Sequence, residues 1–214
     1  TFLARLAFNE CEYIVLEAGL GGVHDATAVF PKILTLVTPI DYDHESFLGS
    51  DISSIAREKL GAIQNTAIIA KQKYSEVNNV AQSMIEEKSI KVYNLDTFIK
   101  KQDSVNIKMI SKELNLADYL EDNLKLSIAC LNFLKLPYIP KHFKGSRLFG
   151  RLTQYKDNII IDVGHNPLAA TSILNALNGK KYTLVYNTYK DKDYAKILEI
   201  LKPIIESVEI IQVN

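Results

Sequence analysis

Acidic residues and a histidine stand directly after two short apolar runs near the start of the chain. Glu17 follows the run at residues 13–16. The next such run, at residues 33–37, is followed by Asp41, Asp43 and His44. Because open parallel sheets bind ligands at the carboxyl ends of their strands, we expect these side chains to lie at one sheet edge. Carboxylate and imidazole groups can share a divalent cation there, while a histidine that caps a loop is the alternative.

A glycine-rich loop, AGLGGVHDAT, follows Glu17. Gly19, Gly21 and Gly22 allow the backbone to approach a flat or bulky group closely. The loop does not match a dinucleotide fingerprint, because His24 stands where that pattern needs glycine, and Gly-Lys-Ser/Thr occurs nowhere in the chain. We therefore do not expect it to be the main phosphate-binding loop. A tight turn with a solvated glutamate is the alternative interpretation.

The second half holds a further polar group in the segment GRLTQYKDNIIIDVGHNPLAA. Arg151 precedes a predicted strand, and Asp162, His165 and Asn166 lie at the carboxyl end of that strand. Pro167 suits the first turn of a helix, whose N-terminus favours an anion or phosphate. Caps and turns are the ordinary roles of aspartate and asparagine at such positions. Their clustering favours the functional interpretation.

The elements that must position these residues alternate along the chain. Strands are predicted at residues 13–16, 33–37, 66–70 and 91–95, and helices at 52–63 and 77–87. A longer helix is predicted at 118–135, with Asp118 as N-cap and Glu121 completing a capping box. The later series is strand 158–163, helix 167–177, strand 182–186, helix 194–205 and strand 208–212. This alternation predicts an α/β protein with a mostly parallel sheet.

One predicted helix carries charges as well as an apolar stripe. In SIAREKLGAI, the residues Ile55, Leu60 and Ile63 form the stripe. The charged run that includes Lys59 is, by composition alone, a solvated face.

The composition excludes several classes of partner. Lysine plus arginine and aspartate plus glutamate both number 25, so no global field favours nucleic acid or an anionic membrane surface. No apolar run approaches the length that spans a bilayer. Cys11 and Cys130 lie far apart among apolar residues, which favours two reduced, buried thiols and a cytoplasmic setting.

The order of the motifs resembles the folylpolyglutamate synthase and dihydrofolate synthase family, in the Mur ligase superfamily. The motifs are EAGLGGVHDAT, DYDHESFLG, IAREKLGAI, the helix YLEDNLKLSIACLNFL, GRLTQY and DVGHNPLAA. The resemblance implies a partial Mur-ligase-type central ATPase domain at residues 1–136 and a linker or hinge at 137–150. The earlier part of a Rossmann-like, glutamate-ligase domain would follow at 151–214.

The same resemblance implies roles for individual residues. Glu17 and His44 match the magnesium ligands, and Lys59 matches a lysine that is carbamylated in this superfamily. His165 matches a histidine near the transferred phosphate.

The implied ligand contacts form two groups. The segment against the pterin matches His24, Asp25 and Ala26. The ATP contacts match Asn123, Arg151 and Asp162. Two pairs depart from the family pattern, since Val23-His24 replaces Arg-Leu and Tyr119-Leu120 replaces His-Gln.

The activity implied is ATP-dependent amide ligation, which adds L-glutamate to dihydropteroate or folates through an acyl phosphate. ATP and Mg²⁺ are the expected cofactors, and small molecules are the expected partners of a protein that is monomeric at full length. The family's phosphate loop lies upstream of the glycine-rich loop, so we expect a fragment that is inactive alone. A Mur-type ligase for another carboxylate and a non-catalytic protein that binds pterin or nucleotide are the alternatives.

Overall fold

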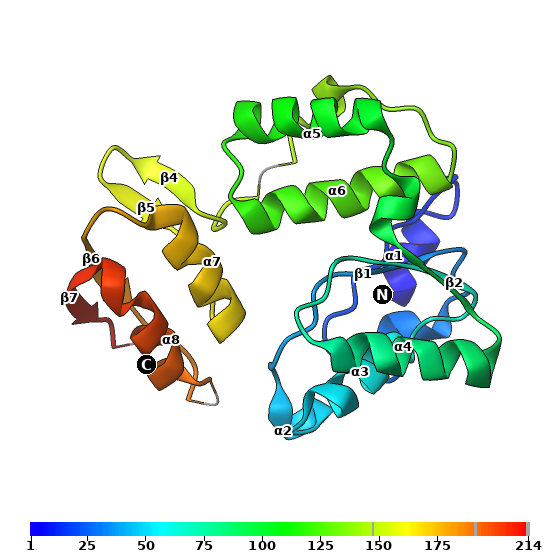
Figure 1. The fold of residues 1–214 in the computed structure, drawn as a ribbon, viewed down its shortest axis with the longest axis horizontal. Helices are drawn as coiled ribbons and strands as arrows, with labels where there is room; N and C mark the ends of the chain where they lie inside the picture. The colour runs from blue at the N-terminus through cyan, green and yellow to red at the C-terminus, as the bar shows by residue number, and fades with distance from the viewer. Residues whose placement is uncertain (147, 191, 213–214) are drawn as a thin grey trace. The chain divides into compact units, whose positions relative to one another are not determined.

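A parallel three-stranded sheet organises the first part of the chain (Figure 1). The computed structural model describes residues 1–146, 148–190 and 192–212, which divide into compact units at 1–97 and 98–214. In the first unit the strands are β1 (Thr35–Val37), β2 (Thr66–Ile69) and β3 (Lys91–Asn94), in the order β1-β2-β3. Its helices are α1 (Phe2–Ala7), η1 (Ala26–Val29), α2 (Glu45–Leu48), α3 (Ile52–Leu60) and α4 (Ser75–Lys88).

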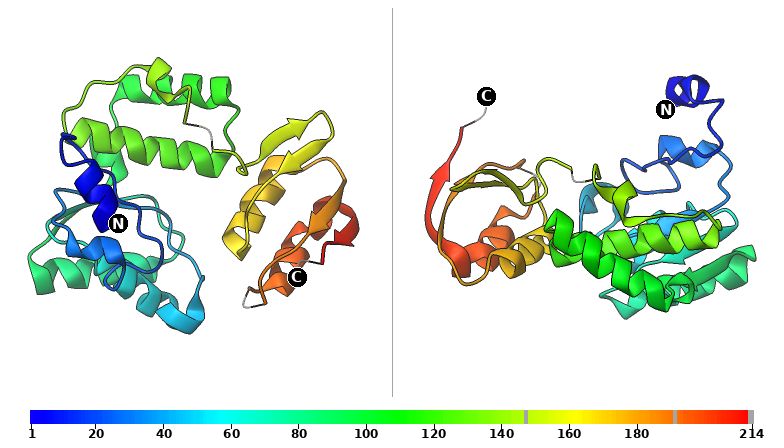
Figure 2. Two further views of the ribbon diagram at one scale, coloured as in Figure 1. Left: turned by 180° about the vertical axis from the view of Figure 1, so that it is seen from behind. Right: turned by 90° about the horizontal axis from the view of Figure 1, so that it is seen from above.

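The core of the first unit lies between the sheet and the helices α3 and α4, which lie side by side (Figures 1 and 2). Ile55 and Leu60 are fully buried and Ile63 nearly so, as the apolar stripe predicts. At the carboxyl ends of the strands, the Gln72 amide accepts from Ile40 N at 2.9 Å and donates to Ala70 O at 2.9 Å. This side chain therefore ties together the two loops that leave β1 and β2.

The second unit begins with two helices, α5 (Lys101–Leu114) and α6 (Asp118–Phe133), which run beside each other (Figures 1 and 2). Ile107, Ile110 and Ile128 belong to the core between them. η2 (Leu95–Phe98) leads into α5, and η3 (Pro140–Phe143) follows α6.

The same unit continues with an antiparallel hairpin of β4 (Thr153–Lys156) and β5 (Ile159–Ile161). After it come α7 (Pro167–Leu177), β6 (Tyr182–Tyr186), α8 (Tyr194–Leu201), η4 (Lys202–Ile204) and β7 (Ile205–Ile210). β6 and β7 pair in parallel, and α7 and α8 pack around a core that includes Ala170, Ile197 and Leu201.

A buried carboxylate joins α5 to the segment after α6. Asp103, which is 5% exposed, accepts hydrogen bonds from Tyr138 Oη at 2.5 Å, Asn132 Nδ2 at 2.8 Å and Lys100 N at 2.7 Å. Burial raises the pKa of Asp103, but these hydrogen bonds outweigh burial and lower the pKa overall. The network replaces the water that the carboxylate loses on folding.

Most predicted elements form, with two clear exceptions among the strands. The apolar run at 13–16 is not a strand, because β1 pairs only with β2 among the described residues and Val15 is 93% exposed. Residues 158–163 were predicted as the first strand of a second parallel sheet, but the strand found there, β5, pairs antiparallel with β4. A two-residue turn at Asp157 and Asn158 instead folds β5 back on β4.

Three smaller predictions are also wrong. Ala117, not Asp118, is the N-cap of α6, and the Glu121 carboxylate pairs with Lys125 Nζ at 3.2 Å instead of closing a capping box. Cys11 is exposed because it lies beside the unpaired run at 13–16, whereas Cys130 is half-buried, and both cysteines are free. The last strand begins at Ile205, three residues earlier than predicted. The described helices include none that is long and apolar enough to cross a bilayer.

Candidate functional site

The glycine-rich loop packs against the C-terminal end of α3. Val23 N donates a hydrogen bond to the carbonyl oxygen of Glu58 at 3.2 Å, and so satisfies one of the carbonyls that a helix end leaves unpaired. A Cβ atom on Gly22 would lie 2.7 Å from the carbonyl oxygens of both Glu58 and Lys59. Gly21 has a φ of +69°. These two glycines therefore allow backbone to approach backbone, and they bring the loop to the residue next to Lys59.

Asp25 folds the same loop upon itself. Its Oδ1 accepts from Thr27 N at 2.8 Å and from Thr27 Oγ1 at 2.7 Å, and its Oδ2 accepts from Gly19 N at 2.9 Å and Leu20 N at 3.2 Å. The Thr27 side chain, followed by the backbone amides, lowers the pKa of Asp25 to about 2. Two carboxylate oxygens offer about four lone-pair sites, so any ligand that reaches this carboxylate must displace one of these donors.

His24 and Ala26 flank this carboxylate. His24 is exposed, and its Nδ1 lies 3.1 Å from Glu58 Oε1 and 3.2 Å from Glu58 Oε2. Ala26 is exposed at the start of η1, for which Asp25 is the N-cap. The surfaces of His24 and Ala26 are thus available to a ligand.

Lys59 lies in the last turn of α3, between Glu58 and the buried Leu60. The Lys59 side chain is half-buried, and its ammonium forms no hydrogen bond or ion pair with any residue in the described ranges. A lysine commonly buries its aliphatic stem while its ammonium stays in water, so this half-burial is compatible with the solvated face that composition predicts.

His44 directly precedes α2 and has an unusual backbone conformation. Its φ is +53°, a region that residues other than glycine seldom adopt, and its carbonyl oxygen accepts from Phe47 N and Leu48 N. His44 Nε2 lies 3.8 Å from Asp43 Oδ1. These backbone contacts hold the start of α2, and they leave both roles that the sequence offered for the His44 side chain, metal ligand and loop cap, as predictions.

The other acidic residues near the strand ends are arranged differently. The Asp41 carboxylate accepts from Tyr74 Oη at 2.8 Å and pairs with Lys73 Nζ at 3.3 Å, so it already has a positive partner. Glu17 is exposed in an irregular segment, and within residues 1–97 the structure shows no contact between its carboxylate and His44. Of the two predicted metal ligands, Glu17 is therefore exposed to solvent, whereas His44 is partly buried.

In the second unit, Asp162 holds the turn that carries Arg151. Asp162 Oδ2 accepts from Leu152 N at 2.8 Å, and Oδ1 accepts from Gly164 N at 2.6 Å. Burial, together with the nearby charge of Asp162 and a hydrogen bond to it, raises the pKa of Tyr119 to about 12, although Arg151 acts in the opposite direction. The structure therefore brings Arg151 and Asp162 together, with Tyr119, one of the residues that depart from the family pattern, as their neighbour.

Asn123 and His165 are both exposed. Asn123 lies one turn after Tyr119 on α6, and its carbonyl accepts from Ser127 Oγ at 2.9 Å. His165 Nδ1 lies 3.1 Å from Val163 O. The next residue, Asn166, is the N-cap of α7 and accepts from Ala169 N at 2.9 Å, which is the capping role that the sequence offered as the alternative.

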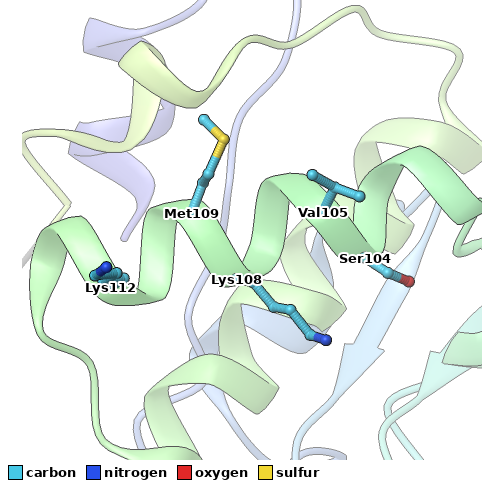
Figure 3. A pocket seen from close by; sticks show the side chains of 5 residues that line it. All are labelled: Ser104, Val105, Lys108, Met109 and Lys112. Carbon is cyan, nitrogen blue, oxygen red and sulfur yellow. The ribbon is translucent and has the colours of Figure 1, made fainter.

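Two hollows accompany these elements. One of 430 Å³ in the first unit is lined in part by Val23, Glu58 and Gly61, where the loop meets α3. Another of 340 Å³ runs along α5 and is lined by Ser104, Val105, Lys108, Met109 and Lys112 (Figure 3). The second hollow contains none of the predicted site residues.

The parallel sheet, its flanking helices and the loop docked on α3 define an α/β protein of the partial Mur-ligase type. No protein-family model matches the chain. The dihydrofolate synthase/folylpolyglutamate synthase of Buchnera aphidicola subsp. Acyrthosiphon pisum is 32% identical over 97% of this chain and 54% of its own length. The comparisons thus confirm the family that the motifs predict.

Solved structures agree with this relationship. The crystal structure of Helicobacter pylori folylpolyglutamate synthetase matches 99% of this chain and 55% of that chain, with 36% identity and a TM-score of 0.72. A Mycobacterium tuberculosis folylpolyglutamate synthase complexed with ADP and AMPPCP shares the fold, with a TM-score of 0.76 and 23% identity over 97% of this chain and 54% of that chain. The chain spans about half the length of the curated relatives it matches.

Proposed function

We propose that this chain is part of an ATP-dependent amide ligase that adds L-glutamate to dihydropteroate or to a folate. The observation that carries the proposal is the relationship to dihydrofolate and folylpolyglutamate synthases over nearly the whole chain. The loop docked beside Lys59 supports it, because two of the motifs that carry the resemblance, EAGLGGVHDAT and IAREKLGAI, come together there.

In the proposed reaction, the γ-phosphoryl group of ATP passes to a carboxylate oxygen of the acceptor, which yields an acyl phosphate and ADP. The amine of glutamate then attacks the acyl carbon, the bond from that carbon to the phosphate oxygen breaks, and the amine loses a proton. Such chemistry requires the protein mainly to position the reactants and to offset charge on the transferring oxygens.

For the metal, we propose Glu17 and His44 as ligands, and a carbamylated Lys59 as a catalytic residue whose carboxylate helps to place the metal. Glu17 is an exposed carboxylate, an oxygen donor of the kind that magnesium prefers, and a carbamate on the Lys59 amine would add oxygen atoms, whereas His44 offers a nitrogen. Magnesium, when bound, supplies positive charge that stabilises the developing negative charge.

For the small molecules, we propose that His24, Asp25 and Ala26 form the wall against the pterin. His24 and Ala26 offer exposed surface, while Asp25 holds the loop in shape. Asn123, Arg151 and Asp162 are proposed as ATP contacts. His165, beside the N-terminus of α7, is proposed to lie near the transferred phosphate.

We further propose that residues 1–136 and 151–214 belong to two domains joined by a hinge at 137–150. Residues 137–150 lie within the second compact unit. The reacting centre would form when the two domains close over ATP. We also propose a monomer at full length and, from two free cysteines, a cytoplasmic setting.

The test compares this chain with a longer polypeptide that contains it together with a Gly-Lys-Ser/Thr loop. We expect acceptor-dependent release of ADP from the longer polypeptide when dihydropteroate or a reduced folate is supplied with glutamate. For the 214-residue chain we expect weak binding of magnesium and ATP in calorimetry and no ADP release.

Each alternative has its own outcome in that test. Binding of pterin or nucleotide by the longer polypeptide without ADP release would support a non-catalytic binding protein. ADP release only with a different carboxylate would support another Mur-type ligase. Strong acceptor-dependent release from the 214-residue chain alone would show that the phosphate loop is dispensable.

A further inference from the structure

Glu58 has no role in the proposed chemistry, yet it contacts the glycine-rich loop through both its backbone and its side chain. It precedes Lys59 in the last turn of α3, and its side chain is 20% exposed. Its carbonyl oxygen accepts from Val23 N at 3.2 Å, so the loop continues the hydrogen bonding of the helix end.

The Glu58 carboxylate binds the adjoining residue of the loop. Its Oε1 accepts from His24 N at 3.2 Å, and both carboxylate oxygens lie within 3.2 Å of His24 Nδ1. Burial raises the pKa of Glu58, but the hydrogen bonds from His24 outweigh burial and lower it overall. A charged acceptor forms a stronger hydrogen bond to a backbone amide than a neutral one does.

Two carboxylates therefore act on one loop in different ways. All four hydrogen bonds that Asp25 accepts come from residues 19–27, so they fold the loop without attaching it to α3. Glu58 attaches the folded loop to the helix. Removal of the Glu58 side chain should loosen the attachment of the loop at His24, while the internal bonds of the loop and the bond from Val23 N to the Glu58 carbonyl remain.

We infer that Glu58 is a positioning residue that anchors the loop of residues 19–27 on α3 and so sets the proposed pterin wall against Lys59. The inference concerning substrate rests on the proposed function, whereas the anchoring itself does not. The bond between the Glu58 and His24 side chains is specific to this chain, since His24 stands where the family pattern has leucine.

Amide hydrogen exchange of the 214-residue chain, followed residue by residue by NMR, tests the anchor. In Glu58→Ala, the His24 amide loses its acceptor and should exchange about tenfold faster, as expected for the loss of a hydrogen bond to a charged group. Glu58→Gln keeps an acceptor oxygen and should give a smaller change. Glu87→Ala is the control, because Glu87 is an exposed glutamate whose partner is Arg57 at 3.5 Å.

Unchanged His24 exchange in Glu58→Ala and in Glu58→Gln would overturn the anchor. Faster exchange throughout α3 and α4 in both variants would also overturn it, since Glu58 would then support the whole unit and not the loop. Faster exchange confined to residues 19–27 supports it.

Kinetics of the longer polypeptide test the link to substrate. We expect Glu58→Ala to raise the acceptor KM about tenfold while the KM for ATP changes less than twofold, with partial rescue in Glu58→Gln. Equal changes in both KM values, or none, would overturn the role in positioning the acceptor. If the unsubstituted protein releases no ADP with any acceptor, the proposed function fails, and the exchange result alone decides whether Glu58 anchors the loop.

Discussion

Asp25 and Thr27 are joined by two hydrogen bonds to one carboxylate oxygen. Asp25 Oδ1 lies 2.8 Å from Thr27 N and 2.7 Å from Thr27 Oγ1. Thr27 is one of the few polar side chains buried among the described residues. The other oxygen of Asp25 holds Gly19 N and Leu20 N. A single charged group thus determines the shape of the glycine-rich loop.

The first prediction concerns the stability of the fold at low pH. The folded-state pKa of Asp25 is about 2, below the ordinary value of 3.8. Its contribution to stability is therefore present above pH 3.8 and is lost as the pH falls toward 2. We expect Asp25→Asn to lower the free energy of unfolding by about 1 kcal/mol at pH 7, because the amide nitrogen of asparagine cannot accept from Gly19 N and Leu20 N, and by less at pH 2.

Urea denaturation at a series of pH values measures this difference. Asp96→Asn is the control, since Asp96 also lies at the start of a 3₁₀ helix but is exposed, and its carboxylate does not organise a loop. A difference between the native chain and Asp25→Asn that stays constant down to pH 2 would show that the charge of Asp25 is not what holds the loop.

The second prediction concerns the metal. Glu17→Gln and His44→Asn in the longer polypeptide should each raise the magnesium concentration needed for half-maximal turnover, by about tenfold or more, because each removes a proposed ligand. Asparagine is chosen at position 44 because it tolerates the positive φ of 53°. Glu12→Gln, a change at another exposed glutamate of the same segment, is the control. An unchanged magnesium requirement would remove the residue concerned from the site.

The third prediction concerns Lys59. If its amine is carbamylated, Lys59→Ala should lose activity that short added carboxylates partly restore, because they supply the missing anion. Lys71→Ala, at an exposed lysine, should remain fully active. Rescue kinetics in the longer polypeptide measure the effect. Full activity of Lys59→Ala without added carboxylate would return α3 to a purely structural role.

Elements with a strong local pattern could be predicted from the sequence. β2 and β3 are short apolar runs between helical segments, and α7 begins at Pro167 after the cap Asn166. The prediction of a strand at residues 13–16 was wrong, because a strand forms only beside a neighbouring strand, and the local sequence pattern does not reveal one. α5 was not predicted, because polar and charged residues stand among its apolar ones, as Lys108 stands between Ile107 and Met109.

In the candidate site, too, some residues could be predicted from the sequence and others could not. Histidines and carboxylates near strand ends stand out by residue type, whereas the contacts of Glu58 do not. His24 and Glu58 are 34 positions apart, and by composition Glu58 belongs to a charged run that is expected to face solvent. Only the docking of the loop on α3 shows that this glutamate has a specific partner.

The last prediction concerns the buried network around Asp103. Tyr138→Phe removes the phenol that lies 2.5 Å from Asp103 Oδ1 and leaves a buried carboxylate short of one donor. We expect the free energy of unfolding to fall by about 1.5–3 kcal/mol at pH 7, the usual range for a hydrogen bond to a charged group. Because hydrogen bonding keeps the folded-state pKa of Asp103 below 3.8, this stabilisation is present above pH 3.8. It is lost as the pH falls through the lowered pKa.

Urea denaturation at pH 7 and at pH 3 tests both the size of this loss and its dependence on pH, with Tyr155→Phe as control because Tyr155 is 56% exposed. Equal losses in the two tyrosine variants would mean that Asp103 does not depend on the Tyr138 hydroxyl.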